Sequence, residues 1–269
     1  MQVQVEPRTS PRIYSWRDMP SRKRDPREVL RANSAAYGAV AASKPAGVTG
    51  DPSTIVTSQT LKCWYRTDTL TNSGSNVVTL TDKSAAGKTL AVTGTAPTIN
   101  ATDGTLSSLQ TVAFASGQGL FNNTSISIAP PFTMMFVAKL TTWASTVALF
   151  GDLASHGLVC GGSSPLLYQN DGSYSNNQSM TTGTWFLVWA EFTNSTSDRI
   201  KVGSNAFTTT PGTNSGNTTM TSVGFNLAGG AGTAVQTIRE GCIWGGLITG
   251  TERTNVTSYV SAQSASIQV

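Results

Sequence analysis

The chain has 269 residues, of which 12% are charged, while Ser, Thr, Asn and Gly are abundant. This length fits one large or two ordinary domains, and the composition suits a β-sheet protein with many polar turns. The sequence holds no apolar run near the roughly 20 residues that a membrane helix needs, and no apolar stretch follows its basic N-terminus, which argues against a secretory signal.

The net charge of +4 comes from the first 31 residues, which hold eight of the 18 Lys and Arg but four of the 14 acids. Pro7, Pro11 and Pro20 interrupt this segment, and its composition cannot bury a core. We predict an extended anchor arm over residues 1–37 with one short helix from Asp25, where Pro26 and a capping-box acid follow an N-cap acid. Residues 38–55, rich in Ala, Gly, Pro and Ser, are predicted as a linker.

The cationic and aromatic side chains of the arm are candidate partner-binding residues. Three interpretations are open: a protein anchor that orders on binding, a nucleic-acid-binding tail and an inert solvated tail. The prolines stiffen the arm, and interspersed acids weaken its attraction for phosphates, so we favour the protein anchor over nucleic acid. The candidates are Arg8, Arg12, Tyr14, Trp16, Arg17, Arg22, Lys23, Arg24 and Arg27.

Residues 56–269 carry the pattern of a β-sandwich. Leu61, Cys63 and Tyr65 alternate with Lys62, Trp64 and Arg66, as in a strand. Clusters of Gly, Asn, Ser and Pro separate the predicted strands at the spacing of a sandwich. Further strands are predicted at residues 77–80, 111–114, 132–140, 146–150, 158–160, 185–192, 199–202 and 223–227.

The C-terminal region combines a strand and a helix. Residues 239–248 are β-branched, aromatic and aliphatic, with glycines that allow close packing, which predicts a buried strand. Thr249 and Glu252 have the spacing of a capping box, and Val256, Tyr259 and Val260 then fall on one helical face. A short C-terminal helix is therefore predicted to cover the sheet.

Five stretches resemble, in order, laminin-G-like, concanavalin A-like jelly-roll domains. They are the opening strand Leu61-Lys62-Cys63-Trp64-Tyr65-Arg66-Thr67-Asp68, the turn at 82–88, the strands at 132–137 and 185–192, and the terminal strand and helix. The turn departs from the family pattern, because Leu80 stands where an aromatic is usual. The resemblance covers about residues 56–262 and implies an all-β concanavalin A-like jelly-roll sandwich with a short C-terminal helix.

The acids of the sandwich do not form a catalytic pattern. Hydrolases of this fold carry an E-x-D-x-x-E run or a close variant, whereas Glu191 is followed by no acid until Asp198 and Glu240 is alone in its strand. The single histidine, His156, is expected to be an exposed turn residue, because it lies in the stretch Ser155-His156-Gly157, and no nucleophile motif accompanies it that would favour catalysis. We expect a non-enzymatic protein without a cofactor.

No metal site is predicted. Asp152, Asn170, Asp171 and Asp198 could offer oxygen ligands to calcium, but they lack the spacing of a calcium loop, and turn formation is the favoured role. The cysteines Cys63, Cys160 and Cys242 show no C-x-x-C spacing. Because the first and last strands of this type of sandwich are often neighbours, a bridge between Cys63 and Cys242 stays open, although buried reduced thiols are favoured.

A candidate glycan patch surrounds a predicted hairpin tip at residues 170–172. Exposed aromatics could stack on a sugar ring, and amide and carboxylate groups could bind its hydroxyls. The alternative is that the two tyrosines stabilise the hairpin as a cross-strand pair. The candidates are Trp143, Tyr168, Asn170, Asp171 and Tyr174.

The order of arm, linker and uncharged sandwich is similar to that of structural proteins of tailed bacteriophages. This predicts a virion structural protein, either a head decoration (cement) protein or a tail-attached accessory protein, assembled in the host cytoplasm. The arm would bind capsid or tail subunits, and many weak contacts of a homo-oligomer would add up. The alternatives are a glycan-binding module that contacts cell-surface polysaccharide and an unusual glycosidase that uses Glu191 or Glu240; no membrane contact is expected.

Overall fold

The computed structural model describes residues 50–106, 108–124, 126–143, 147–152, 156–160, 166–171, 174–193, 198–209, 219–228 and 235–269, with the backbone alone at 101–102, 166–171, 174–176 and 228. The predicted arm, its helix and most of the linker lie outside these residues. In the described part, no helix is both long and apolar enough to cross a membrane.

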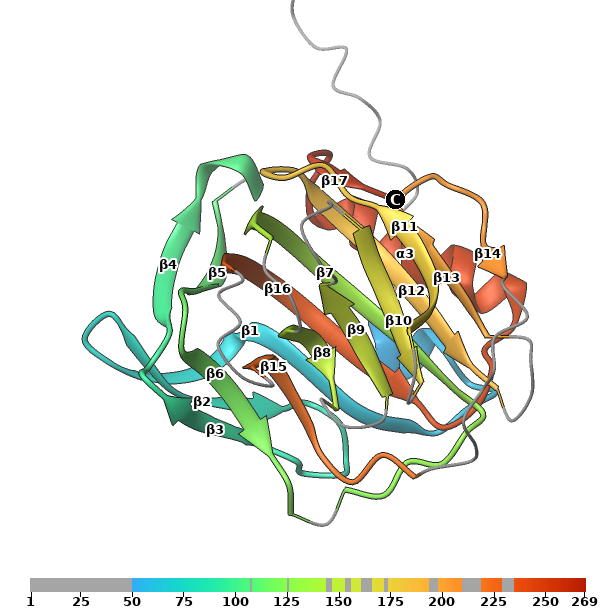
Figure 1. The fold of residues 1–269 in the computed structure, drawn as a ribbon, viewed down its shortest axis with the longest axis horizontal. Coiled ribbons are helices and arrows are strands. Elements are labelled where there is room, and N and C mark those ends of the chain that lie inside the picture. The colour runs from blue at the N-terminus through green and yellow to red at the C-terminus, as the bar shows by residue number, and fades with distance from the viewer. Residues whose placement is uncertain are drawn as a thin grey trace, which may run out of the picture. The chain divides into compact units, whose positions relative to one another are not determined.

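The described part is almost entirely β-structure (Figure 1). The elements are α2 (Pro52–Ile55), β1 (Leu61–Ser73), β2 (Asn76–Asp82), β3 (Leu90–Gly94), β4 (Thr98–Asp103), the 3₁₀ helix η2 (Gly104–Leu106), β5 (Leu109–Phe114), β6 (Gln118–Asn122), β7 (Phe132–Thr142), β8 (Val147–Gly151), β9 (His156–Cys160), β10 (Leu166–Asp171), β11 (Tyr174–Ser179), β12 (Trp185–Phe192), β13 (Arg199–Val202), β14 (Thr208–Thr209), β15 (Val223–Ala228), β16 (Val235–Trp244), α3 (Gly250–Gln263) and β17 (Ile267–Gln268).

The strands form two sheets, which we call the front sheet and the back sheet. In the back sheet, β16 pairs with β7 along one edge and with β1 and β5 along the other, and β7 pairs in turn with β12, which carries β13 and the parallel strand β17. The front sheet runs β3-β6-β15-β8-β9-β10-β11. Strand β2 pairs with both β1 and β3 and so joins the two sheets. Figure 1 looks onto the front sheet, with the back sheet and α3 behind it.

Aromatic side chains fill the space between the sheets. Phe150 and Phe225 of the front sheet stack at 4.8 Å, and Phe136 of the back sheet stacks on Phe150 at 5.5 Å. A Cβ atom on Gly241 would lie 3.0 Å from the rings of Phe150 and Phe225, so this glycine in β16 makes room for them. Each fully buried phenylalanine contributes about 1.5–3 kcal/mol of hydrophobic stabilisation.

A second apolar layer covers the outer face of the back sheet. Trp64, Trp189 and Trp244 are buried there together with Val256 and Val260 of α3. Strand β1 therefore buries both of its faces, because Cys63 and Tyr65 point between the sheets while Trp64 points toward α3. The predicted all-β jelly-roll sandwich with a short C-terminal helix is confirmed.

Helix α3 begins at the predicted capping box. The Glu252 amide donates to Thr249 Oγ1 over 3.2 Å, and the Thr249 amide donates to Glu252 Oε2 over 3.0 Å. Glu252 also accepts hydrogen bonds from the amides of Thr57 and Ser58, both at 2.8 Å. Burial alone would raise the pKa of Glu252, but the hydrogen bonds from Ser58, Thr249 and Thr57 outweigh it and lower the pKa to about 2.

The turn that resembles the jelly-roll family is organised by one carboxylate. Asp82 accepts hydrogen bonds from the amides of Trp64, Ser84 and Lys88, each at 2.8 Å, and from the Ser84 hydroxyl. These bonds fasten the turn to strand β1, so the aspartate that the motif shares with the family has a structural role here.

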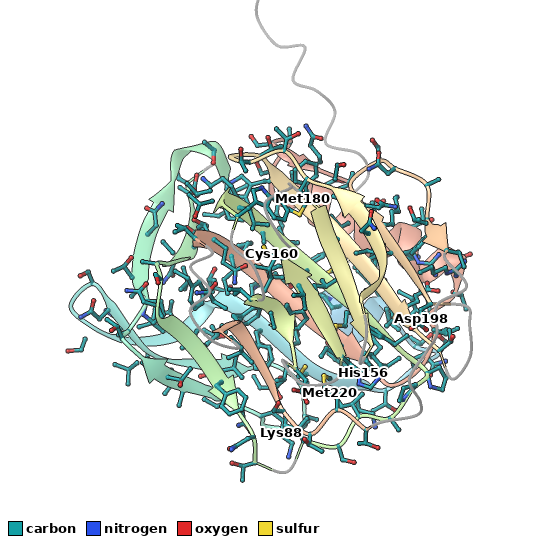
Figure 2. All side chains as sticks on the ribbon, in the orientation of Figure 1. Lys88, His156, Cys160, Met180, Asp198 and Met220 are labelled. Atoms are coloured by element: carbon teal, nitrogen blue, oxygen red, sulfur yellow. The ribbon has the colours of Figure 1, made fainter. Side chains whose placement is uncertain are left out.

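The structure decides between the two interpretations of the cysteines and corrects the expectation for His156. The cysteine strands β1 and β16 are neighbours, but Trp64 pairs with Cys242 and Cys63 pairs with Ile243, so the two thiols lie on opposite faces of the sheet. Both are free and buried, which confirms the favoured interpretation and excludes the alternative of a bridge between them. His156 is fully buried in β9, with its ring 5.4 Å from those of Phe132 and Phe192, and is not an exposed turn residue (Figure 2). The end of the predicted linker forms helix α2, which the Asp51 side chain caps.

Candidate functional site

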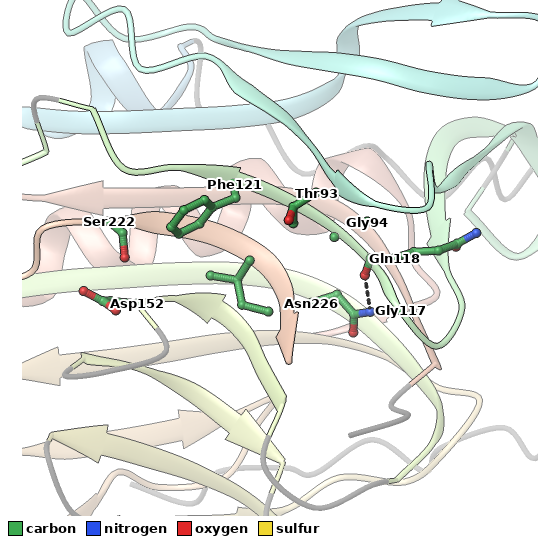
Figure 3. Close-up of a pocket in the computed structure, with 10 residues that line it drawn as sticks. Thr93, Gly94, Gly117, Gln118, Phe121, Asp152, Ser222 and Asn226 are labelled. Atoms are coloured by element: carbon green, nitrogen blue, oxygen red, sulfur yellow. Dashed lines mark hydrogen bonds between the residues drawn. The ribbon is translucent and has the colours of Figure 1, made fainter. Parts of the chain in front are cut away.

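A hollow of about 440 Å³ opens on the outer face of the front sheet (Figure 3). We call it the front pocket. Strands β3, β6 and β15 form its floor, and the end of β8 supplies one wall. Its lining residues are Thr93, Gly94, Gly117, Gln118, Gly119, Phe121, Asp152, Ser222, Asn226 and Leu227.

Glycines keep the floor of the front pocket low. A Cβ atom on Gly119 would lie 2.9 Å from Thr93 Cγ2 and 3.3 Å from the Asn226 carbonyl oxygen. Gly94 has a φ of +71°, and a Cβ atom there would lie 2.4 Å from the Gly117 carbonyl oxygen. Side chains at these positions would strain the backbone or fill the hollow, so a ligand can approach the strand backbones closely.

The apolar part of the lining consists of Phe121 and Leu227. Leu227 is buried in a small cluster with Ala148 and Val159 on the outer face of the front sheet, and the half-buried Phe121 packs against that cluster. Phe121 is therefore supported by apolar side chains beneath it, and its ring stays partly accessible. An aromatic side chain in this state offers a flat apolar surface at low entropic cost.

Two amides of the lining hold the site together. The Asn226 side chain donates to the carbonyl oxygens of Gln118 (2.7 Å) and Ala115 (3.3 Å) and so fastens β15 to the start of β6. Asn226 has a φ of +56°, a conformation that asparagine adopts more readily than most residues. The Gln118 side chain is tied to backbone groups of Ala96 and Ala115. These amides position the floor, and their side-chain hydrogen bonds are already used.

Asp152 is the one ionisable residue in the described lining of the front pocket. Its side chain is largely buried, and the Thr221 amide lies 3.4 Å from its Oδ2 atom. Ser222 and Thr93 add hydroxyl groups on either side of Phe121 (Figure 3). The pocket thus combines one aromatic ring, one carboxylate and two hydroxyls, without any cation among the described lining residues.

The residues of the predicted glycan patch come from other parts of the fold. Trp143 follows β7 and packs partly against the core between the sheets, and its indole N–H finds no acceptor among the described residues. Tyr168, Asn170 and Asp171 belong to β10 and Tyr174 to β11, which form the predicted hairpin with Asn170 opposite Tyr174. Their side chains, like the nine candidate residues of the arm, lie outside the described part of the structure.

Glu240 is engaged in a polar network beneath α3. The Trp64 indole N–H donates to its Oε1 atom over 2.6 Å, and the Gln263 amide donates to its Oε2 atom over 2.7 Å. The Tyr259 hydroxyl adds a third hydrogen bond at 3.0 Å. Burial raises the pKa of Glu240, and the hydrogen bonds from Gln263 and Trp64 oppose that rise. The network joins α3 to β1 and β16.

Glu191 lies on the same face of the back sheet but in β12, two strands away from Glu240. It is opposite Thr133 of β7, whereas Glu240 is opposite Val137, so the two acids are also offset along the strands. Arg199 and Arg253 both form ion pairs with Glu191. The two carboxylates therefore do not face each other as the acids of a retaining glycosidase do, about 5 Å apart. The described residues hold no cluster of three or more His, Cys, Asp or Glu that could bind a metal ion.

The comparisons with known proteins concern the fold. No protein-family model matches the chain, and no curated protein matches it in sequence. An arabinofuranosidase complexed with arabinofuranosyl-α-1,2-xylobiose is similar in structure, with a TM-score of 0.55 and 14% identity over 70% of this chain and 51% of that chain. Domain 4 of AbnA, an extracellular arabinanase from Geobacillus stearothermophilus in complex with arabinotriose, has a TM-score of 0.50 and 16% identity over 75% of this chain and 98% of that chain.

The binding domain of Paraclostridial Mosquitocidal Protein 1 is a third similar structure, with a TM-score of 0.51 and 13% identity over 75% of this chain and 52% of that chain. The chain thus spans about half the length of the arabinofuranosidase and of this binding domain. At identities this low, the structural similarity establishes a shared β-sandwich fold and nothing further. Function depends on the site that each protein carries on its fold.

Proposed function

We propose that the sandwich is a non-enzymatic glycan-binding module that takes a neutral sugar in the front pocket. The observation that carries this proposal is the placing of the partly accessible Phe121 ring beside Asp152 and two hydroxyls above a glycine floor. Concave sites with an apolar platform and a few convergent polar groups are the usual form of small-ligand sites. The oligosaccharide complexes of two proteins with this fold are compatible with the proposal but do not carry it.

Each part of the front pocket has a role in sugar binding. The C–H face of a pyranose or furanose ring stacks on Phe121. The Asp152 carboxylate accepts hydrogen bonds from sugar hydroxyls, and a hydrogen bond to a charged group contributes about 1.5–3 kcal/mol. Few such contacts offset the cost of association, so we expect single-site dissociation constants near the millimolar range. Repeated sites on an oligomer would raise the avidity.

A glycan array with the full chain tests this proposal. We expect binding to a neutral glycan, and we expect it to be lost in Phe121→Ala and weakened at least tenfold in Asp152→Asn. Asp68→Asn is the charge-matched control, because Asp68 lies outside the pocket in a partly exposed ion pair with Arg66. Full binding by Phe121→Ala, or equal losses in Asp152→Asn and Asp68→Asn, would contradict the proposal.

The lack of catalysis is part of the proposal. The tight engagement of Glu191 by two arginines and of Glu240 by three hydrogen-bond donors supports structural roles for both acids. We expect no turnover of polysaccharides by the wild-type chain, and therefore no change in turnover in Glu191→Gln or Glu240→Gln. Turnover of any polysaccharide by the wild-type chain that either substitution removes would contradict this part.

The sequence of the arm favours a second, compatible role as a virion structural protein of a tailed bacteriophage, at the head or the tail. Its excess of cations, its three prolines and its aromatics precede a sandwich without net charge. In this proposal the arm binds capsid or tail subunits during assembly in the host cytoplasm, and a homo-oligomer displays the sandwich. Deletion of residues 1–33 should abolish incorporation into particles and leave the sandwich folded; incorporation of the truncated chain would refute the anchor.

A further inference from the structure

A second hollow, of about 340 Å³, lies on the other side of the sandwich, between the end of β13 and helix α3. We call it the rear pocket. Residues on and after β13 (Lys201, Asn205, Phe207) form one wall, and residues of α3 (Arg253, Thr254) face them. None of its described lining residues is acidic, in contrast to the front pocket.

The arginine on its wall is held in place before any ligand arrives. Arg253 and Arg199 form ion pairs with the two oxygens of Glu191, whose side chain is 1% exposed. Both guanidinium groups also lie against the Phe207 ring, at 4.7 Å for Arg199 and 4.9 Å for Arg253. A guanidinium fixed in this way loses little further conformational freedom when it binds a ligand.

Lys201 adds a cation that no described acid neutralises. In β13, Ile200 and Val202 are buried between the sheets, so Lys201 lies on the opposite face together with Arg199. The described ion pairs include none from Lys201. Glu252 of the same helix is not among the described lining residues, because its carboxylate is directed to Ser58, Thr57 and Thr249. The pocket therefore keeps an excess of positive charge that would attract an anion.

The rest of the lining matches a ring that bears hydroxyl groups. Phe207 offers an apolar surface, and the Asn205 amide and the Thr254 hydroxyl offer polar contacts. Thr254 donates its own proton to the Gly250 carbonyl oxygen over 3.0 Å, so its oxygen can accept a hydrogen bond from a ligand. Guanidinium and ammonium groups bind carboxylates through charge-assisted hydrogen bonds.

We propose that the rear pocket is a second ligand site, which takes a sugar residue that carries a carboxylate, such as a uronic acid. Glu191 offsets one of the two arginines that bind it, and Lys201 adds a further positive charge, so the pocket favours an anionic ligand. The site shares no described lining residue with the front pocket, so it can be tested independently of the function proposed above.

Titrations of the full chain, followed by amide signals in ¹⁵N-correlated NMR spectra, test the site. The probes are methyl β-D-glucuronide and the uncharged methyl β-D-glucoside. We expect the glucuronide to shift the signals of residues 201–207 and 250–257, and the glucoside to leave them in place. Lys201→Gln should weaken binding of the glucuronide at least threefold. Lys88→Gln makes the same change of charge outside both pockets and should have no effect on binding.

Three results would overturn the proposal. These are unchanged signals in both segments, equal affinities of wild type and Lys201→Gln, and displacements of equal size with sodium acetate alone, which would reveal an adventitious ion only. Phe121→Ala must keep the glucuronide response, since its loss there would place the ligand in the front pocket. Failure of the neutral-glycan experiment with a positive result here would reject the front site and leave the rear site standing.

Discussion

The front and rear pockets use the same sandwich in opposite ways. The front pocket is a hollow between strand backbones that glycines leave open, with a single carboxylate, Asp152, and no cation among its described lining residues. The rear pocket is a gap between a strand edge and a helix, with Arg253 and Lys201 on its walls. Helix α3 brings Arg253 to the back sheet beside Lys201 of β13, so the two faces of the sandwich carry opposite charge.

The largest expected effect concerns the ion pairs under the rear pocket. Glu191→Ala would leave two guanidinium groups without their buried partner, and loss of one member of such a pair costs about 3–5 kcal/mol. Urea unfolding should show this loss, while Asp152→Asn at the front should change the free energy of unfolding by less than about 1 kcal/mol. Equal losses of unfolding free energy in both variants would contradict the view that charge pairs stabilise the rear face and not the front face.

A pH dependence should follow from Glu252, which fastens α3 and so the rear wall. Hydrogen bonds lower its folded-state pKa to about 2, below the value of about 4.3 for an unfolded chain. This stabilisation is complete above about pH 5 and is lost as the pH falls toward 2, because the unfolded chain takes up the proton first. We expect a loss of about 2 kcal/mol over that interval in wild type.

The Glu252→Gln variant is the control for this dependence. It should be less stable than wild type at pH 7 and should lose less stability between pH 5 and pH 2, as thermal unfolding at each pH would reveal. A variant with the same acid-induced loss as wild type would show that other carboxylates cause it.

A smaller effect on stability, but a clear one on binding, is expected at the front floor. Gly119→Ala places a methyl group 2.9 Å from Thr93 Cγ2, so Thr93, which lines the hollow, must shift. We expect the affinity for the neutral glycan to fall about tenfold, which corresponds to about 1.4 kcal/mol. Gly104→Ala is the matched control, because a Cβ atom there meets nothing within 4 Å. Calorimetry with both variants would sharpen the assignment of the floor.

The smallest effect should be that of salt on the front pocket. Its ligand is uncharged, so a rise from 20 to 300 mM NaCl should change its affinity by less than about twofold. Binding of the glucuronide at the rear pocket should weaken more strongly over the same range, since screening acts on the attraction between opposite charges. Equal salt dependence at the two sites would remove the electrostatic difference between them.

The sequence predicts the strands and the helix start well because their signals are local. Thr249 and Glu252 form the capping box that their spacing indicates, and the alternation around Cys63 marks a real strand. The same alternation could not reveal that Trp64 is buried as well, because that depends on α3, which lies far along the chain. The predicted exposure of His156 is wrong for a similar reason. Its glycine neighbour suggests a turn, whereas Phe132 and Phe192 from other strands pack against its ring.

The front pocket could not be predicted in the same way. Its floor combines β3, β6 and β15; of these, only β15 corresponds to a predicted strand, at residues 223–227, and no local pattern indicates that the three strands lie side by side. The glycines at 117 and 119, just before Phe121, were the one local signal, since two glycines around a single residue suggest a close approach. That Asp152 and Ser222 join them follows from the pairing of β15 with β6 and β8, which is a property of the fold.

The most direct test of the central claim, a neutral-sugar site on the front sheet, is a crossed titration. Wild type, Phe121→Ala and Lys201→Gln are each titrated with the neutral glycan found on the array and followed by calorimetry. We predict that binding disappears in Phe121→Ala and is unchanged in Lys201→Gln. Retained binding in Phe121→Ala, with a loss in Lys201→Gln, would contradict the account, because the neutral ligand would then occupy the rear pocket.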